Sequence, residues 1–261
     1  MGQMRKEAHM TGKDLMGMVQ LTPAAVGKYA IVPGPKERAD AIVSKLTNVV
    51  KNFTFMEYTM HTGDFEGTKL TTINGGRFAA DTSITTEILC NAGVKAMIRA
   101  GSCGALREDM KVGDIVIVDT AIKGEGVTQY YVDKNFIPTA DKKLTADLKE
   151  IAENSQHIKL TGENKVHCGK CWTTDAILRE TREHVGKAID QGAIAVDMVT
   201  SAFLTICQLY KIPAAVILAV SDNVITGEMG FINPDYYMAE GAMLEIAFDL
   251  VRKLEGKTQQ V

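Results

Sequence analysis

The chain has 261 residues, 46% of them hydrophobic, and a formal net charge of −3 at pH 7. This length and composition suffice for one sizeable core, and the slightly acidic balance predicts no general attraction to nucleic acid or to an anionic membrane. No apolar run reaches the roughly 18 residues of a transmembrane helix, and the polar opening residues 1–13 lack the apolar centre of a signal peptide. We therefore expect a soluble, cytoplasmic protein.

The five cysteines are an odd number and are scattered along the chain. This pattern favours reduced thiols over a disulfide framework. Only Cys168 and Cys171, in the sequence HCGKC, have the spacing of a redox or zinc motif, and no second pair is present to complete a four-ligand zinc site. We expect two ordinary thiols near the end of a strand and no metal.

Hydrophobic periodicity predicts alternating strands and helices in the first half of the chain. The predicted strands are 28–32, 53–62, 69–73 and 94–98, and the predicted helices are 38–46 and 84–91. Thr82 or Ser83 is expected to cap the second helix, and Gly93 to end it. A further turn is expected at 63–67.

In the second half, the predicted strands are 115–118, 194–198 and 214–220, and the predicted helices are 144–154, 201–210 and 239–254, with a loop at 231–237. Strands that alternate with helices predict one α/β domain with a mixed, largely parallel central sheet flanked by helices. We expect this domain to span residues 18–258, after a polar N-terminal extension over residues 1–17.

Residues 97–106 (MIRAGSCGAL) carry the strongest functional signal. An apolar run leads into Arg99, and a turn of small residues, including Ser102, is expected over 99–104. Glycines let backbone N–H groups approach a ligand closely, and a guanidinium offers a planar, charged fork to an anion. The alternative is an ordinary turn with Arg99 extending to solvent.

Two other loops follow predicted strands, where ligands of α/β sheets usually bind. Gly34 and Arg38 lie beside the start of a predicted helix, a favourable position for an anion. Asp222 follows a very apolar strand, where partial burial would raise its pKa and suit it to general acid catalysis. Capping a turn is the alternative role for Asp222.

Taken together, these loops resemble the nucleoside phosphorylase family, which contains hexameric purine nucleoside phosphorylases, uridine phosphorylases and related nucleosidases. The resemblance spans about residues 21–254. It rests on five motifs in the family's order: IVPGPKER (31–38), IRAGSCGAL (98–106), VGDIVI (112–117), VDM (196–198) and VSDN (220–223). Any one motif is weak, but five in order are specific.

The resemblance implies reversible phosphorolysis of a nucleoside, which yields a free base and ribose or deoxyribose 1-phosphate. Inorganic phosphate is then the co-substrate, with no metal or organic cofactor. The implied phosphate-binding residues are Gly34, Arg38, Arg99 and Ser102. The implied nucleoside-binding residues are Cys103, Gly104, Ile177, Asp197 and Met198. Asp222 matches the acid that, in purine-specific members, protonates the purine ring as the bond breaks.

The sequence departs from the family pattern where partners complete the site. Where the family has an arginine supplied by the neighbouring subunit, this chain has Met56. Met18 stands in place of a histidine from the neighbour, and Val199 in place of a glutamate that binds the ribose. Loss of a charge-assisted hydrogen bond costs about 1.5–3 kcal/mol, so either the site is rebuilt or the substrate differs. We hypothesise that Arg77 replaces the missing charge or binds an extra substrate phosphate; the alternative is an arginine that faces solvent.

The choice of base stays open. Asp222 favours a purine, whereas residues 21–34 look more like the uridine branch, and Thr181 and Glu183 fall near that branch's base-reading glutamine and arginine. A hydrolytic nucleosidase and a catalytically impaired nucleoside-binding relative are the other hypotheses. The resemblance also implies a homo-oligomer built from dimers, up to a hexamer.

Overall fold

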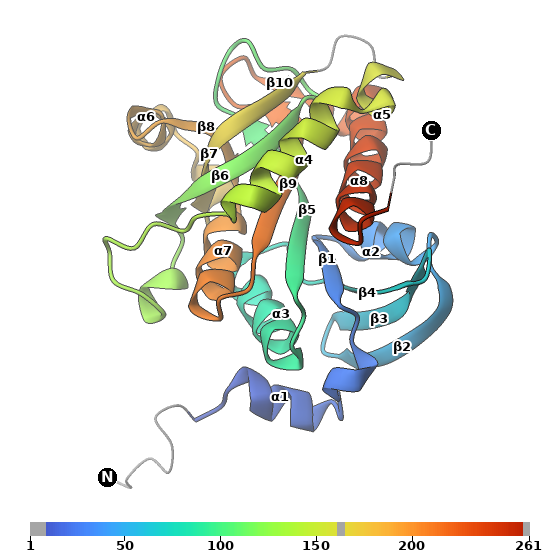
Figure 1. The fold of residues 1–261 in the computed structure, drawn as a ribbon. Coiled ribbons are helices and arrows are strands. Elements are labelled where there is room, and N and C mark those ends of the chain that lie inside the picture. The colour runs from blue at the N-terminus through green and yellow to red at the C-terminus, as the bar shows by residue number, and fades with distance from the viewer. Residues whose placement is uncertain (1–8, 161–164, 258–261) are drawn as a thin grey trace, which may run out of the picture.

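The computed structural model describes residues 9–160 and 165–257, and within them a ten-stranded mixed sheet is covered by helices (Figure 1). The strands are β1 (Tyr29–Pro33), β2 (Thr47–Phe55), β3 (Tyr58–Phe65), β4 (Thr68–Ile73), β5 (Ala96–Ala105), β6 (Ile115–Gly124), β7 (Val166–Thr174), β8 (Ala193–Asp197), β9 (Ala214–Asn223) and β10 (Glu228–Met229). The α-helices are α1 (Gly12–Met18), α2 (Lys36–Val43), α3 (Ala79–Ala92), α4 (Lys142–Asn154), α5 (Gln156–Leu160), α6 (Arg182–Asp190), α7 (Thr200–Leu209) and α8 (Pro234–Leu254). Short 3₁₀ turns are η1 (Pro23–Ala25), η2 (Thr128–Tyr130), η3 (Ile177–Arg179) and η4 (Gly230–Ile232).

The sheet closes on itself through β5. This strand pairs in parallel with β9 and antiparallel with β8, and β9, β6, β7 and β8 pair in turn, so five strands form a ring. Strands β1, β4, β3 and β2 extend from the ring as an open arm. The expected α/β fold with a mixed central sheet is confirmed.

Two hydrophobic cores lie on opposite faces of the sheet. Helices α1, α3 and α7 contribute to one core, which contains the fully buried Phe203. Helices α2, α4 and α8 contribute to the other, which contains Phe248. Helix α1 lies inside the segment expected to be an extension, and its Met16 packs into the first core.

Two expected strand boundaries are wrong. The expected strand 53–62 is divided by a turn at Met56, which has a left-handed φ of +52°, and the two halves form the hairpin β2–β3. Alternation of apolar and polar residues continues through a short turn, so the pattern does not reveal the break. The expected turn at 99–104 lies inside β5, which continues to Ala105. Small residues are compatible with a strand here because it is buried on both sides.

Three further differences concern helix ends and one strand. Helix α3 begins at Ala79, before Thr82 and Ser83, although it ends at Gly93, as expected, with a φ of +84°. Helix α8 begins at Pro234 inside the expected loop, where the Asn233 side chain caps it. Strand β7 contains the HCGKC motif and was not among the expected strands.

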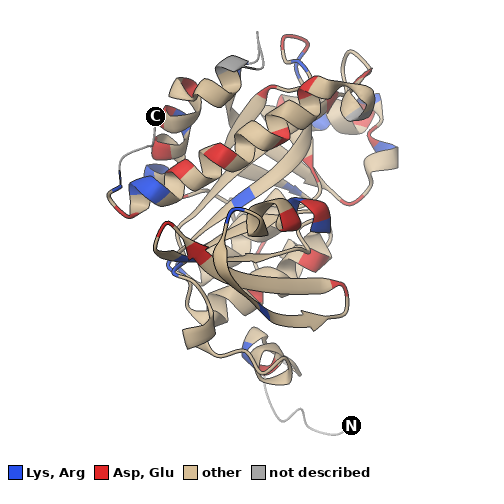
Figure 2. Ribbon diagram, turned by 90° about the vertical axis from the view of Figure 1, so that its right-hand side faces the viewer, with Lys and Arg blue, Asp and Glu red and all other residues tan. Residues whose placement is uncertain are grey.

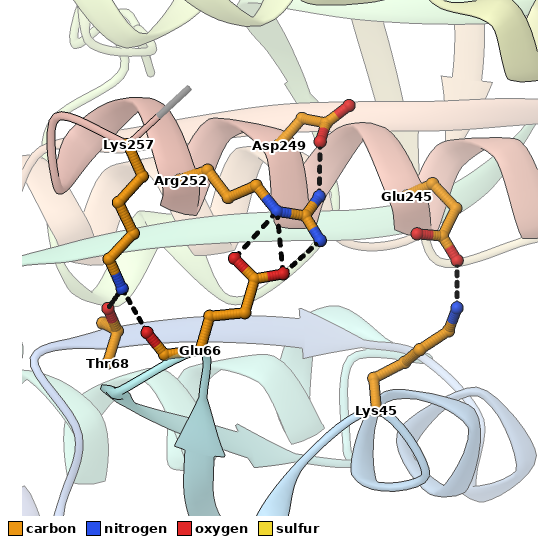
Figure 3. A network of polar contacts seen from close by, with 7 residues as sticks. All are labelled: Lys45, Glu66, Thr68, Glu245, Asp249, Arg252 and Lys257. Carbon is orange, nitrogen blue, oxygen red and sulfur yellow. Dashed lines mark hydrogen bonds and ion pairs between the residues drawn. The ribbon is translucent and has the colours of Figure 1, made fainter. Parts of the chain in front are cut away.

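Charged side chains join α8 to the β3–β4 hairpin and to the segment just after α2 (Figure 3). Arg252 is bound by both oxygens of Glu66, with an Nη2–Oε1 distance of 2.6 Å, and pairs with Asp249 at 2.5 Å. Its guanidinium also lies 4.8 Å from the centre of the Phe65 ring. These contacts attach the C-terminal half of α8 to the β3–β4 hairpin.

We expect Arg252→Met to lower the free energy of unfolding by about 1–2 kcal/mol, because partly buried, bidentate charged hydrogen bonds are stronger than exposed pairs. Lys253→Met is the matched control, since Lys253 is more exposed and should contribute under about 0.5 kcal/mol. Urea unfolding measures both, and equal losses would contradict the expectation. The Arg252 hydrogen bond lowers the pKa of Glu66 below 4.5. The Arg252 contribution should therefore be present above pH 4.5 and decline as the pH falls through that lowered value.

Basic and acidic residues are intermixed over the ribbon in Figure 2. Among the described residues, no helix combines the length and apolar character needed to cross a membrane.

Candidate active site

A cavity of about 630 Å³ opens beside β5, β8 and β9. This volume suits a small molecule. The residues expected at the site come from six separate segments of the chain, and every one of them lines this cavity: Gly34, Arg38, Arg77, Arg99, Ser102, Cys103, Gly104, Ile177, Asp197, Met198 and Asp222.

Strand β5 creates the opening by changing its neighbour. Along one edge, its residues 96–100 pair with β1, whereas Gly104 and Ala105 pair with β8. The two neighbouring strands diverge between these points, so Ser102 and Cys103 lie at a gap in the sheet. A change of neighbour of this kind is where α/β sheets bind ligands.

Arg99 lies inside the sheet at one end of the cavity. Its side chain is 3% exposed, one Nη donates to the carbonyl of Val32 at 3.4 Å, and its buried Nε has no hydrogen-bond partner among the described residues. Burial lowers its pKa to about 10, and nearby Asp197 partly offsets this effect. Arg99 is therefore still charged at neutral pH. A buried cation with so few partners is suited to bind an anion.

Two glycines leave room for this guanidinium. A Cβ atom at Gly76 or at Gly101 would lie 2.7 Å from a nitrogen of Arg99. Gly101 belongs to the motif identified from the sequence, whereas Gly76 comes from the segment after β4, so the sequence alone does not connect it with Arg99.

Arg38 approaches the same end of the cavity from α2. It is 5% exposed, Nη1 donates to the carbonyl of Ala100 at 3.3 Å, and its Nε is also buried without a described partner. Two residues of α8, Tyr236 and Glu240, bind its other terminal nitrogen. Sequence analysis missed both, because they lie about 200 residues from Arg38 on a helix whose pattern indicates only core packing.

Asp222 lines the cavity farther along the sheet: it pairs with Gly104 of β5, whereas Arg99 of β5 pairs with Val216. A β-bulge in the β5–β9 pairing shifts the register, so that Gly104 faces Asp222 and Ser221 is the extra residue. A Cβ atom at Gly104 would lie 3.0 Å from an Asp222 oxygen and equally close to Val196 and Val224, so a larger residue there would crowd the carboxyl group. Burial raises the pKa of Asp222, while a 2.7 Å hydrogen bond from the Ser221 hydroxyl acts in the opposite direction.

Glu180 is a second acid in this part of the cavity that sequence analysis missed. It lies just after η3, and its half-buried carboxyl has a pKa raised to about 7, chiefly by burial and further by Asp222. Its environment could not be anticipated, since the segment that contains it reads as an ordinary polar loop. The base-reading positions considered from the sequence were Thr181 and Glu183 instead.

Asp197 is buried and fully engaged within the protein. Its carboxylate accepts hydrogen bonds from Thr173 at 2.9 Å and from the backbone and hydroxyl of Thr200 at distances down to 2.6 Å. These bonds hold the start of α7 against β8. Met198 and Val199 follow directly and line the cavity, Val199 being 1% exposed.

Arg77 lies on the cavity wall with half of its side chain exposed, and it pairs with the exposed Glu57 at 2.9 Å. An exposed pair of this kind is weak, so the guanidinium is available to a ligand. Met56 and Met18 are 74% and 57% exposed and do not line the cavity.

The two cysteines of the HCGKC motif do not form a disulfide with each other. Cys168 is exposed and Cys171 is buried, because residues three apart in a strand point to opposite faces, and both are free thiols. Among the described residues, no three His, Cys, Asp or Glu side chains cluster in a way that could hold a metal.

Comparisons with known proteins agree with this geometry. The family model described as "Phosphorylase superfamily" matches residues 28–241. The guanosine phosphorylase of Halorubrum lacusprofundi is 27% identical over 83% of this chain and 87% of its own length. A DeoD-type purine nucleoside phosphorylase of Bacillus cereus is 28% identical over 88% of this chain and 96% of its own length.

Among solved structures, the uridine phosphorylase of Vibrio fischeri superposes with a TM-score of 0.80 at 22% identity, covering 94% of this chain and all of that one. At this identity the likeness establishes the fold. The family model extends from β1 into α8 and includes every residue expected at the site. The resemblance of the motifs is confirmed, and the chain belongs to the phosphorylase superfamily.

Proposed function

We propose that this protein is a cytoplasmic nucleoside phosphorylase that cleaves the N-glycosidic bond of purine nucleosides with inorganic phosphate as co-substrate. One observation carries the proposal: a single cavity has two buried arginines, each with a nitrogen that has no partner among the described residues, and, farther along β5 and β9, a half-buried carboxylic acid. Relatives named guanosine, purine nucleoside and uridine phosphorylases support it. The five free thiols fit a reducing compartment.

In the proposed mechanism, phosphate binds against Arg38 and Arg99 with help from Ser102 and the backbone of Gly34. The ribose lies between phosphate and base, beside Met198. As the glycosidic bond lengthens, the sugar gains oxocarbenium character, and the phosphate neutralises this charge before it attacks the anomeric carbon. The departing base gains negative charge, and Asp222 relieves it by donating a proton.

Two features support a purine. Asp222 is a proton donor beside the base position, and a purine ring nitrogen is a suitable acceptor. Glu180 adds a second carboxyl group at this end, which could accept hydrogen bonds from N–H groups on a purine edge. Cys103 and Gly104 would lie beside the base, with Ile177 on its open side.

The exposed apolar rim supports the expected homo-oligomer. Ile177, Leu178 and Met229 line the cavity yet are 55%, 92% and 58% exposed. A second copy that covered this rim would bury these side chains and exclude water from the reaction. Arg77, at the same rim, would supply charge toward the phosphate in place of the arginine absent at Met56.

The test is base release from inosine, guanosine, adenosine and uridine, each with and without phosphate. We expect release only with phosphate, and faster from purine nucleosides than from uridine. Equal rates without phosphate would identify a hydrolytic nucleosidase. Nucleoside binding without turnover would identify a catalytically impaired relative.

A further inference from the structure

Glu240 contacts the phosphate end of the cavity indirectly, through Arg38. It lies on α8, its carboxylate pairs with Nη2 of Arg38, and it is not one of the cavity-lining residues. The Arg38 side chain is 5% exposed and that of Glu240 is 25% exposed. Arg38 therefore faces the cavity on one side and a carboxylate on the other.

Tyr236, one helical turn before Glu240, completes this arrangement. Its hydroxyl donates to Glu240 at 3.0 Å, lies 3.4 Å from Nη2 of Arg38, and is hydrogen-bonded to Ser102. Burial, chiefly, raises the pKa of Tyr236 to about 12, so the hydroxyl keeps its proton near neutral pH. One phenol thus connects α8 to both an arginine and a serine at the expected phosphate position.

The electrostatics explain why a carboxylate is needed there. Arg38 and Arg99 are both buried, and the charge of Arg38 contributes to the lowered pKa of Arg99. Two like charges in a poorly solvated place require a counter-charge. Among the described residues, Glu240 is the carboxylate that forms an ion pair with Arg38. Because it binds from the side of α8, the cavity side is left for a ligand.

We propose that Glu240, together with Tyr236, is a positioning residue for phosphate: it fixes the guanidinium of Arg38 in the orientation that an anion in the cavity requires. The inference rests on the proposed function for the identity of the anion. Without Glu240, Arg38 keeps its charge but gains rotational freedom, and part of the binding energy of phosphate is spent on ordering it. The nucleoside end of the cavity is unaffected.

The test compares Glu240→Ala, Glu240→Gln and Tyr236→Phe with the wild-type protein. Inorganic phosphate is titrated calorimetrically without nucleoside, and KM is measured separately for phosphate and for inosine. Removing an outer partner of a binding residue usually changes affinity 10- to 100-fold in metal sites, and we expect about tenfold weaker phosphate binding for Glu240→Ala. Glu240→Gln should give an intermediate loss of about threefold to fivefold, because its amide oxygen can still accept from Arg38 but the counter-charge is gone. Tyr236→Phe, which keeps the ring, should weaken phosphate binding about threefold.

Glu245→Ala is the matched control. Glu245 also pairs across from α8, with Lys45 in the segment just after α2, but does so outside the cavity (Figure 3), so phosphate binding and both KM values should stay unchanged. Thermal melting checks that each variant folds, and Tyr236→Phe still tests the proposal if Glu240→Ala does not fold.

Unchanged or tighter phosphate binding in Glu240→Ala would overturn the proposal, and tighter binding would show that Glu240 competes with the anion. Equal increases in KM for phosphate and inosine would also overturn it, since they indicate a general structural defect. The calorimetric result is independent of turnover. If the variants change phosphate binding as expected but the wild-type protein shows no phosphorolysis, the proposed function is rejected and the positioning role of Glu240 is retained.

Discussion

Asp222→Asn is expected to lower kcat for purine nucleoside phosphorolysis by about 100- to 1,000-fold, the usual contribution of a well-placed general acid. Asparagine has nearly the same shape and can still accept the hydrogen bond from Ser221, but it cannot donate a proton of comparable acidity. Steady-state kinetics with inosine and saturating phosphate measure the loss. KM for phosphate should change little, because the acid lies at the other end of the cavity. A loss below about threefold would show that Asp222 is not the acid.

The pH profile provides a second measure of the same residue. Asp222 acts in its protonated form, so activity should fall as the pH rises through its pKa. Burial raises this pKa and extends the active range toward neutral pH. The charge of Asp222 raises the pKa of Glu180, whereas the raised pKa of Asp222 comes from burial and not from Glu180. The alkaline limb should therefore keep its position in Glu180→Gln and disappear in Asp222→Asn.

Arg99→Gln is expected to lower kcat/KM for phosphate by about 100-fold or more, because the variant removes a buried charge that makes charge-assisted hydrogen bonds to the anion. The same substitution should not lower the stability of the fold. A buried guanidinium with one weak hydrogen bond among the described residues opposes folding, so the variant should melt at the same temperature as the wild type or higher.

Arg107→Gln is the control for Arg99→Gln. Arg107 follows β5 by two residues, is half exposed and pairs only with Asp109 among the described residues. Its replacement should leave both kcat/KM and the melting temperature unchanged. An Arg99→Gln protein that binds phosphate normally, or that unfolds at a much lower temperature, would show that Arg99 has a structural role instead.

Much of the fold could be predicted from the sequence because its strands and helices are long and strongly patterned. The apolar run that forms β9 and the amphipathic pattern of α4 are both found where expected. The division between β2 and β3 could not be predicted, since Met56 adopts its left-handed φ without a glycine. The extension of β5 through glycine and serine depends on pairing with β9, which is a tertiary contact.

The candidate site was predictable where a ligand group stands in a distinctive motif. Arg99, Asp222 and Gly34 all line the cavity, as the loops after their strands suggested. Glu240 and Glu180 were not predictable, because no local pattern distinguishes them from surface acids. Glu240 meets α2 through its ion pair with Arg38, and Glu180 is influenced by the charge of Asp222. Both relations join segments far apart in the chain.

The continuity of β5 through the site has a consequence for substrate size. Ser102, at the phosphate end, and Gly104, at the base end, are two residues apart in one strand, so their separation is about 6–7 Å. A hydrogen-bonded strand neither stretches nor shortens, and β9 pairs with β5 from Met97 to Ala105, with the extra residue of the bulge on the β9 side. The strand therefore fixes the distance between the anion and the base at about the width of one sugar ring. Side chains around the cavity can alter which base is accepted, but this spacing is a property of the backbone.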